Sequence, residues 1–294
     1  MAPQSLPTGH RTIVVDGIFF QMQQTGIARL WENLLTRWAG TPFGERILLV
    51  DRGSSAPRIP GIRTVEHPRY DYANFDADRM AMQEICDRER ASFFVSTYYT
   101  TPISTPSVFY AYDMIPEFAG VLDPSKSPWP EKHFAIRHAS AHVAISRSTA
   151  DDLIRFHPAA DGRVGIAHCG VDPVAFHPET PGNVDKFRRD TGMDRPYFLY
   201  VGSKLHYKNA ILFLDSFSRL PDRDDLGIVF SGGETLDMNE LSRFTGKARI
   251  LQARLDDSQL RAAYTGAEAL VHPSLYEGFG LPILEAMACG CPVV

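Results

Sequence analysis

Two glutamates and two glycines near the end of the chain could together bind a phosphorylated sugar. Glu277 and Glu285 have seven residues between them, including Gly278 and Gly280, and the apolar segment that follows predicts a helix from about Leu281. The start of a helix presents backbone amides and a positive dipole end, and glycines let a ligand approach the backbone closely. The segment therefore predicts an anion site flanked by carboxylates.

The role of the two carboxylates follows from their charge. A carboxylate repels an anion, so Glu277 and Glu285 are better suited to accept hydrogen bonds from hydroxyl groups around a phosphate. A sugar nucleotide offers such hydroxyls. Pro282 suits the first turn of the helix, where its missing N–H costs no hydrogen bond. The alternative is an ordinary strand–turn–helix unit with two solvated glutamates.

Two lysines could supply positive charge to the same phosphates. Lys204 and Lys208 follow Gly202, which ends a segment of strand character. Lysines bind phosphate through charge-assisted hydrogen bonds, although a lysine in a loop is more often simply solvated. The strand–glycine–helix context favours the phosphate role, more strongly for Lys208 than for Lys204.

The segment from Glu277 to Pro292 resembles the E-x7-E signature of the group 1, or family 4, retaining glycosyltransferases, which have the GT-B fold. The positions that agree are Glu277, Gly278, Phe279, Gly280, Leu281, Pro282, Glu285, Ala286, Ala288, Gly290 and Pro292. The resemblance implies donor-binding roles for Gly26, Lys204, Lys208, Arg254, Leu255, Glu277, Gly278, Phe279, Gly280, Leu281 and Glu285. It implies catalytic roles for Glu277, Lys208 and Asp113.

A second resemblance lies at Tyr110–Glu117, after another predicted strand, where ligands of open α/β sheets collect. This segment is similar to the family's His-Asp-Leu-Ile-Pro motif, and Asp113 and Pro116 match it. Tyr112 stands at the usual histidine position, where it either donates a hydrogen bond in place of the histidine or fills space. Asp113 either serves the reaction or caps a helix.

The resemblance implies a retaining hexosyltransferase that moves a sugar from a nucleotide diphosphate donor to an acceptor hydroxyl of a glycan or a lipid-linked glycan. Glu277 would hold the sugar and Glu285 the ribose. Lysines and amides would neutralise the leaving diphosphate, so neither a metal nor a cofactor is expected. GDP-mannose is the first expectation for the donor and a UDP-sugar the second. The alternatives are a nucleotide-sugar-binding protein without turnover and a glycoside hydrolase that uses the two carboxylates.

Composition limits the class of protein. The chain has 294 residues, 44% of them hydrophobic and 22% charged, with a net charge of −5, which is typical of a globular protein and argues against general nucleic-acid binding. The N-terminus lacks the apolar core of a signal peptide, and no 18-residue apolar run is present. Four scattered cysteines are expected to be buried and reduced, in a cytoplasmic protein. Membrane contact is expected to be peripheral at most, because the apolar side chains near Trp31 are better explained by packing on a sheet.

Strands alternate with helices along the chain, which predicts α/β architecture with parallel sheets. Predicted strands are Arg11–Val15, Arg46–Val50, Ser92–Ser96, Ser107–Ala111, His142–Ala144, Val164–Ala167, Tyr197–Val201, Leu226–Phe230 and Ala269–His272. Predicted helices are Ile27–Trp38, Asn209–Leu220, Ser258–Thr265 and the segment from Leu281.

These elements predict two Rossmann-like domains, which the GT-B resemblance places on either side of a cleft. The expected boundaries are 1–171 for an acceptor-side domain, 172–195 for a proline-rich linker and 196–294 for a nucleotide-sugar-binding domain. Pro292–Val294 has the character of a buried strand. More elements follow this point in the resembled family, so we expect a truncated sequence with an incomplete second domain.

Overall fold

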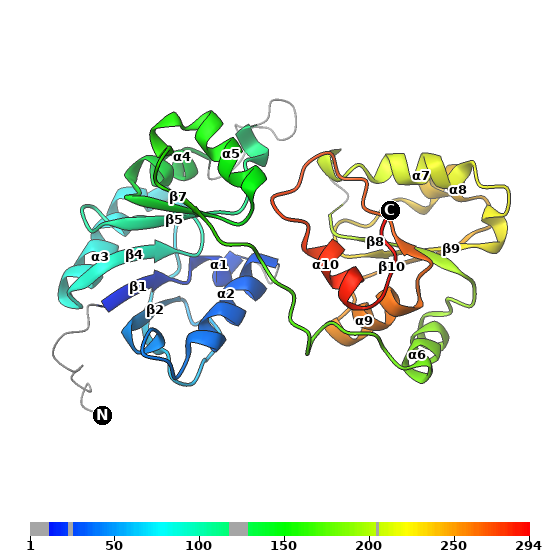
Figure 1. Cartoon of the computed structure of the whole chain (residues 1–294), viewed down its shortest axis with the longest axis horizontal. Helices are drawn as coiled ribbons and strands as arrows, with labels where there is room; N and C mark the ends of the chain where they lie inside the picture. Colours follow the sequence, from blue (N-terminus) through cyan, green and yellow to red (C-terminus); the bar gives the residue numbers. More distant parts are fainter. Residues whose placement is uncertain (1–11, 23–25, 118–128, 204–205) are drawn as a thin grey trace. The chain divides into compact units, whose positions relative to one another are not determined.

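A computed structural model describes residues 12–22, 26–117, 129–203 and 206–294. The chain divides into two compact units, Met1–His168 and Cys169–Val294. Each unit contains a parallel β-sheet with helices packed against it (Figure 1). The predicted α/β architecture with two Rossmann-like units is therefore confirmed.

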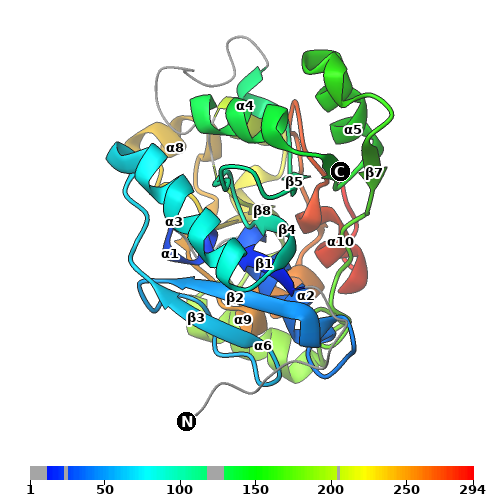
Figure 2. The same cartoon turned by 90° about the vertical axis from the view of Figure 1, so that its left-hand side faces the viewer.

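The first unit is built on a seven-stranded parallel sheet in the order β3-β2-β1-β4-β5-β6-β7. The strands are β1 (Thr12–Asp16), β2 (Ile47–Arg52), β3 (Arg63–His67), β4 (Ala91–Ser96), β5 (Ser107–Ala111), β6 (Ala141–Ala144) and β7 (Val164–Ile166). The helices are α1 (Ile18–Met22), α2 (Gly26–Trp38), α3 (Phe75–Arg88), α4 (Trp129–His138) and α5 (Arg147–Phe156). Figure 2 shows α2 and α3 on opposite faces of this sheet. Strand β1 is buried along its whole length, as expected of a central strand covered on both faces.

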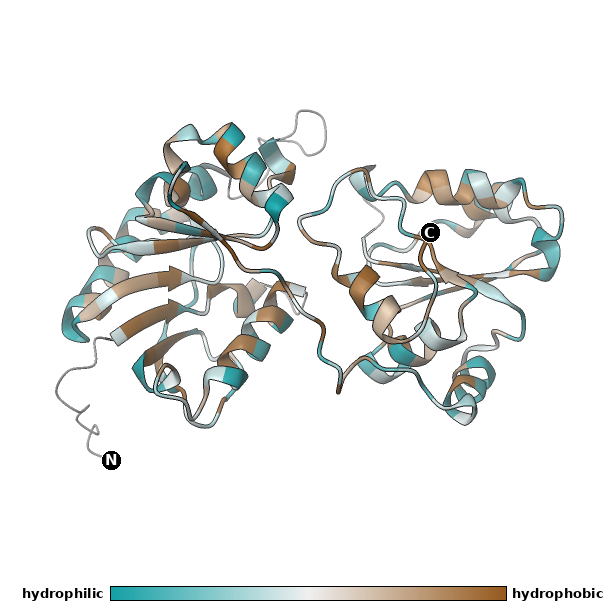
Figure 3. Cartoon of the chain, viewed as in Figure 1, coloured by the Kyte–Doolittle hydropathy of each residue, from teal (hydrophilic) through white to brown (hydrophobic). Residues whose placement is uncertain are grey.

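The second unit contains a four-stranded parallel sheet in the order β10-β9-β8-β11. Its strands are β8 (Tyr197–Val201), β9 (Gly227–Ser231), β10 (Arg249–Ala253) and β11 (Ala269–Leu270). Its helices are α6 (Pro181–Thr191), α7 (Ala210–Ser218), α8 (Met238–Thr245), α9 (Asp257–Gly266) and α10 (Leu281–Ala288). Figure 3 shows hydrophobic residues concentrated on the strands of both units.

The two faces of the second sheet have separate hydrophobic cores. Leu199 and Val229 pack with α6, α9 and α10, whereas Tyr200 and Phe230 pack with α7 and α8. Side chains alternate between the faces of a strand, so neighbouring residues enter different cores. This double-sided burial explains why the strands are continuously apolar and were predictable from sequence.

The predicted strands occur within a few residues of their expected positions, and the helix from Leu281 begins at that residue. Prediction missed the helices α1, α3, α4, α6 and α8 and the strands β3 and β10. Strand β3 is an edge strand of the first sheet and β10 an edge strand of the second. Since edge strands bury less surface, both strands include charged or polar residues (RTVEH and RILQA), which weakens their strand signal.

The interval 172–195, expected to be a linker, requires a correction. It contains α6, which begins after the N-cap Thr180 with Pro181 in its first turn and ends at Gly192, a left-handed C-cap with φ of 68°. Phe187 of this helix is buried in the core of the second unit. The prolines of this interval therefore mark the start of a helix as well as loop structure.

The last residues of the chain extend the second sheet. Val293 forms an isolated parallel bridge with Leu270 of β11. Leu270 donates its amide hydrogen to the Pro292 carbonyl, and the Val294 amide donates to Leu270. The expected strand pairing is present, and the Val294 side chain is 77% exposed.

Candidate functional site

Two loops meet at the carboxyl edge of the second sheet. One follows β8 and the other follows β11, and these strands are neighbours in parallel register. The Leu275 amide donates to the Tyr207 carbonyl at 2.8 Å, which joins the loops through their backbones. Lys208 Nζ, from the first loop, lies 2.6 Å from Glu277 Oε1, from the second. Two residues predicted as separate donor contacts thus form an ion pair with each other.

Glu277 is held in its ionised form by its neighbours. His272 Nε2 also lies 3.1 Å from Glu277 Oε1, an ion-pair distance without the alignment of a good hydrogen bond. Burial opposes ionisation of Glu277, but the contacts with His272 and Lys208 outweigh it and lower its pKa to about 2. The Lys208 and Glu277 side chains are 15% and 22% exposed. Glu277 is therefore ionised at neutral pH, and both side chains can be reached by a ligand.

Helix α10 begins immediately after this pair. Its N-cap, Gly280, has φ of 88° in the left-handed region, which glycine adopts without strain. The Ile283 amide donates to the Gly280 carbonyl, while glycine has no side chain that could accept from the other amides of the first turn. Gly278 and Gly280 are buried and Phe279 and Leu281 are half-buried. The predicted glycine turn and helix N-terminus are therefore present beside Glu277.

Glu285 lies within α10 and is only 8% exposed. Its Oε2 accepts a hydrogen bond of 3.0 Å from the hydroxyl of Tyr264, a fully buried residue of α9. Burial, followed by the nearby Glu285 charge, raises the pKa of Tyr264 well above its usual value, so this hydroxyl remains a donor. One oxygen of Glu285 is thus fixed by the protein, which orients the carboxylate.

Two more predicted donor residues of the second unit, Arg254 and Leu255, lie at the same edge of the sheet. Arg254 and Leu255 follow β10; Arg254 is exposed, whereas Leu255 packs against the core. A side chain at Gly233, after β9, would approach the Gly202 carbonyl oxygen to 2.6 Å, so only glycine allows these loops to come together. Lys204 lies outside the described residues.

Gly26 and Asp113 belong to the first unit. Gly26 is the exposed first residue of α2. Asp113 follows β5, and its Oδ1 accepts a hydrogen bond of 3.0 Å from the Ile115 amide, at the start of a short 3-10 helix. The capping alternative considered for Asp113 is thus present in the structure, and its catalytic role stays a prediction.

Tyr112 is buried and makes its hydrogen bonds inside the first unit. Tyr112 is 6% exposed, its hydroxyl donates to the Thr97 carbonyl at 2.8 Å, and the Trp31 indole donates to it. Trp31 and Leu35 of α2 are buried, which confirms that the apolar residues of this helix pack inward.

All four cysteines are buried and free, as expected.

Sequence reasoning missed His272 and Tyr264 as members of the site. His272 was placed at the end of a predicted strand, and the carboxyl ends of parallel strands gather at one edge, so its position was a usable signal. Tyr264 carried no such signal in the sequence, because its contact with Glu285 depends on how α9 packs against α10.

Within the described ranges no helix is long and apolar enough to cross a membrane.

Comparisons with known proteins agree on one class of protein. Residues 183–294 match the family Glycosyl transferases group 1. Alpha-maltose-1-phosphate synthase of Mycobacterium tuberculosis is 30% identical over 181 residues, which cover 57% of this chain and 46% of that protein. A D-inositol 3-phosphate glycosyltransferase of Pseudarthrobacter chlorophenolicus is 29% identical over 194 residues, covering 59% and 44%. The chain thus spans about half the length of the curated relatives it matches.

Solved structures show the same fold across nearly the whole chain. A sucrose-phosphate synthase from Thermosynechococcus elongatus aligns with a TM-score of 0.73 at 16% identity, covering 96% of this chain and 80% of that one. Anabaena HepE in complex with UDP-glucose aligns with a TM-score of 0.65 at 14% identity, covering 97% and 80%. The chain therefore has the α/β GT-B fold. Residues 183–294 match the group 1 glycosyltransferases, which confirms the resemblance found in the sequence.

Proposed function

We propose that the protein is a retaining glycosyltransferase that moves a hexose from a nucleotide diphosphate sugar to an acceptor hydroxyl in glycan synthesis. The observation that carries the proposal is the charged Lys208–Glu277 pair beside the N-terminus of α10. A cation and a helix N-terminus together suit a diphosphate. An adjacent carboxylate suits the hydroxyls of the attached sugar.

The Lys208–Glu277 pair defines how the donor would enter. In the absence of donor each charge neutralises the other at 2.6 Å. A diphosphate would compete for the Lys208 ammonium, and the released Glu277 oxygen would accept hydrogen bonds from sugar hydroxyls. Charge that develops on the leaving diphosphate would then be stabilised by Lys208 and by the amides of α10. We propose that this requires no divalent ion, so added Mg²⁺ should leave donor affinity unchanged.

Glu285 is assigned to the ribose of the nucleotide. Its carboxylate is oriented by Tyr264, and it lies one turn inside α10, past the amides proposed to bind phosphate. Each carboxylate oxygen can accept more than one hydrogen bond, so the bond from Tyr264 is compatible with bonds from ribose hydroxyls to the same carboxylate.

The donor is the least determined part of the proposal. GDP-mannose was the first expectation from the sequence, but the relatives named above carry no mannose in their descriptions. HepE has been crystallised with UDP and with UDP-glucose, which favours a UDP-sugar for this chain. A panel of GDP-, UDP- and ADP-sugars in thermal-shift experiments would rank them, because a ligand stabilises by RT ln(1 + [L]/Kd).

The decisive experiment compares the two glutamates by calorimetric titration. Glu285→Gln should weaken a nucleoside diphosphate and its sugar nucleotide equally, because both contain the ribose. Glu277→Gln should leave the nucleoside diphosphate nearly unchanged and reduce turnover. Tyr264→Phe is the control for orientation, since it removes the hydroxyl that fixes Glu285 and keeps the carboxylate. Equal losses for both ligands in both glutamate variants would contradict the assignment of the sugar to Glu277.

Release of free nucleoside diphosphate separates the rival functions. A transferase releases it in an acceptor-dependent manner, whereas a hydrolase acting on the donor releases it with water alone. A binding protein without turnover releases none. Acceptor-dependent release with retention of the anomeric configuration in the product would support the proposed reaction.

A further inference from the structure

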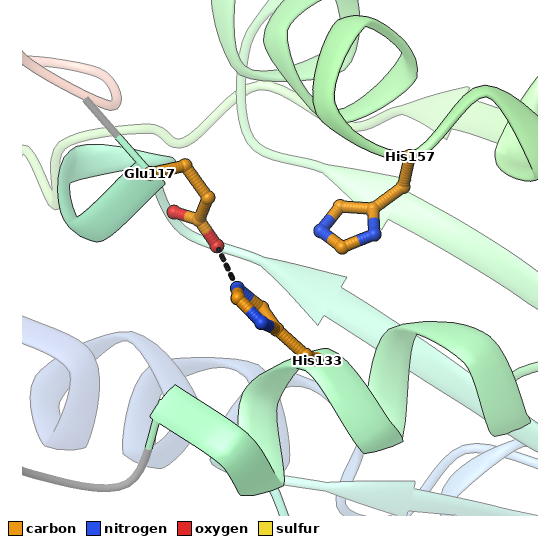
Figure 4. Close-up of side chains that lie close together, drawn as sticks. All are labelled: Glu117, His133 and His157. Carbon is orange, nitrogen blue, oxygen red and sulfur yellow. Dashed lines mark ion pairs between the residues drawn. The ribbon is translucent and has the colours of Figure 1, made fainter. Parts of the chain in front are cut away.

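Glu117, His133 and His157 form a cluster in the first unit that the proposed reaction does not use. One ligand atom from each side chain lies within 4.8 Å of the others. Figure 4 shows the three side chains converging from three segments: the short 3-10 helix after β5, α4, and the end of α5. Their separation in sequence hid the cluster from motif analysis.

Ordinary hydrogen bonding leaves part of this cluster unexplained. The Glu117 side chain is 5% exposed, and its Oε2 accepts from the buried Lys132 ammonium at 2.8 Å. Its Oε1 lies 3.3 Å from His133 Nε2 without hydrogen-bond alignment. Among the described residues, Glu117 Oε1 and His157 Nε2 are buried polar atoms without a hydrogen-bond partner. A buried oxygen or nitrogen left in this state is costly, and a bound ion is one way to satisfy it.

We propose that Glu117, His133 and His157 bind a zinc ion. Two imidazoles and a carboxylate are a ligand set suited to Zn²⁺. Tetrahedral ligands at about 2.0–2.1 Å from zinc lie about 3.3 Å from one another, which is the separation of Glu117 Oε1 and His133 Nε2. The His133 side chain is 41% exposed, so it can rotate to shorten the longer separations. Water would complete the tetrahedron.

The charged groups nearest the cluster are the Glu117 carboxylate and the cations Lys132 and Arg137. Lys132 neutralises the Oε2 side of Glu117 but leaves Oε1 directed at the imidazoles. Lys132 also donates to the Asp113 carbonyl at 3.0 Å, so the cluster is connected to the loop after β5. Zinc bound here would hold this loop to α4 and α5, a stabilising role separate from the donor site of the second unit.

The test is a titration of the metal-stripped full chain with Zn²⁺ against a chromophoric chelator. We expect one equivalent to bind with micromolar or tighter affinity and to raise the thermal midpoint of unfolding. His133→Gln and His157→Gln should each weaken binding by about tenfold or more, the scale of disturbing a metal shell. His177→Gln is the matched control, because His177 is exposed and lies in the other unit.

Co²⁺ provides a readout of ligand type. A site of two imidazoles and a carboxylate should give the visible bands of tetrahedral Co²⁺ without thiolate charge-transfer absorption, which distinguishes it from adventitious binding by the four cysteines. Far-UV circular dichroism of the variants checks their folding. The proposal is overturned if the wild type binds no stoichiometric Zn²⁺, if folded His133 and His157 variants bind as tightly as the control, or if Co²⁺ shows thiolate ligation.

Discussion

Each unit places an ion-pair cluster at the carboxyl edge of its parallel sheet, and the two clusters differ in solvent access. In the first unit Arg52, which ends β2, donates two hydrogen bonds of 2.8 and 2.7 Å to Asp16, which ends β1, and two more to Asp78 of α3. Arg52 and Asp16 are fully buried. In the second unit Lys208 and Glu277 are 15% and 22% exposed.

The difference separates a structural role from a binding role. Arg52 has its guanidinium donors matched to carboxylates, and Thr100 adds a hydrogen bond to Asp16, so the network fixes the strand ends and loops of its unit. Lys208 can exchange Glu277 for a ligand because the solvent reaches both groups. Similar chemistry at equivalent edges thus gives stability in one unit and a candidate donor site in the other.

The largest effect is expected from breaking the buried network. Arg52→Met should lower the free energy of unfolding by about 3–5 kcal/mol, because it leaves two buried carboxylates without their partner. Denaturant unfolding of the full chain measures this loss. Arg219→Met is the control, since Arg219 pairs with Asp215 on the surface and its side chain is 76% exposed. A loss as small as that of the control would mean that the network does not stabilise the first unit.

Ionisation of Glu277 should make the free energy of unfolding depend on pH in the acid range. Its pKa falls from 4.5 to about 2 on folding, so its ionised form contributes stability above pH 4.5 that is lost as the pH falls toward 2. This pKa shift corresponds to about 3 kcal/mol in the free energy of unfolding. Denaturation followed between pH 5 and pH 2 should show a weaker pH dependence in Glu277→Gln than in the wild type. Identical profiles would contradict the lowered pKa.

Lys208→Met should weaken binding of a nucleoside diphosphate by about 1.5–3 kcal/mol, the scale of a hydrogen bond to a charged group. Calorimetric titration against the wild type measures the change. Lys186→Met offers a matched control, because Lys186 is 68% exposed and pairs with Asp190 on α6. If affinity is unchanged, Lys208 serves only to pair with Glu277.

The smallest effect is expected at Tyr264. Tyr264→Phe should cost about 1.5 kcal/mol of stability, the low end for a hydrogen bond to a charged group, since the Glu285 carboxylate remains 8% exposed. Thermal and denaturant unfolding would measure it. A loss as large as that of Arg52→Met would show that Glu285 belongs to a buried network of the first kind, which would weaken its proposed role toward the ribose.

The amino-acid sequence determined the elements whose signals are local. Continuous apolar strands such as β8, the N-terminus of α10 and its left-handed Gly280 follow from residue type and short-range spacing, because burial on both faces and positive φ select those residues. The helix α6 was missed because its short apolar content and flanking prolines are equally typical of a linker.

Tertiary structure decided which charged groups meet and which reach solvent. Lys208 and Glu277 are 69 residues apart in sequence, and Arg52 and Asp16 are 36 apart. Their pairing depends on which strands are neighbours in a parallel sheet, and their exposure depends on the elements that cover the sheet edge. The sequence therefore determined the chemical types available at each edge, whereas packing decided that one pair is buried and the other accessible, since both properties arise from contacts between segments distant along the chain.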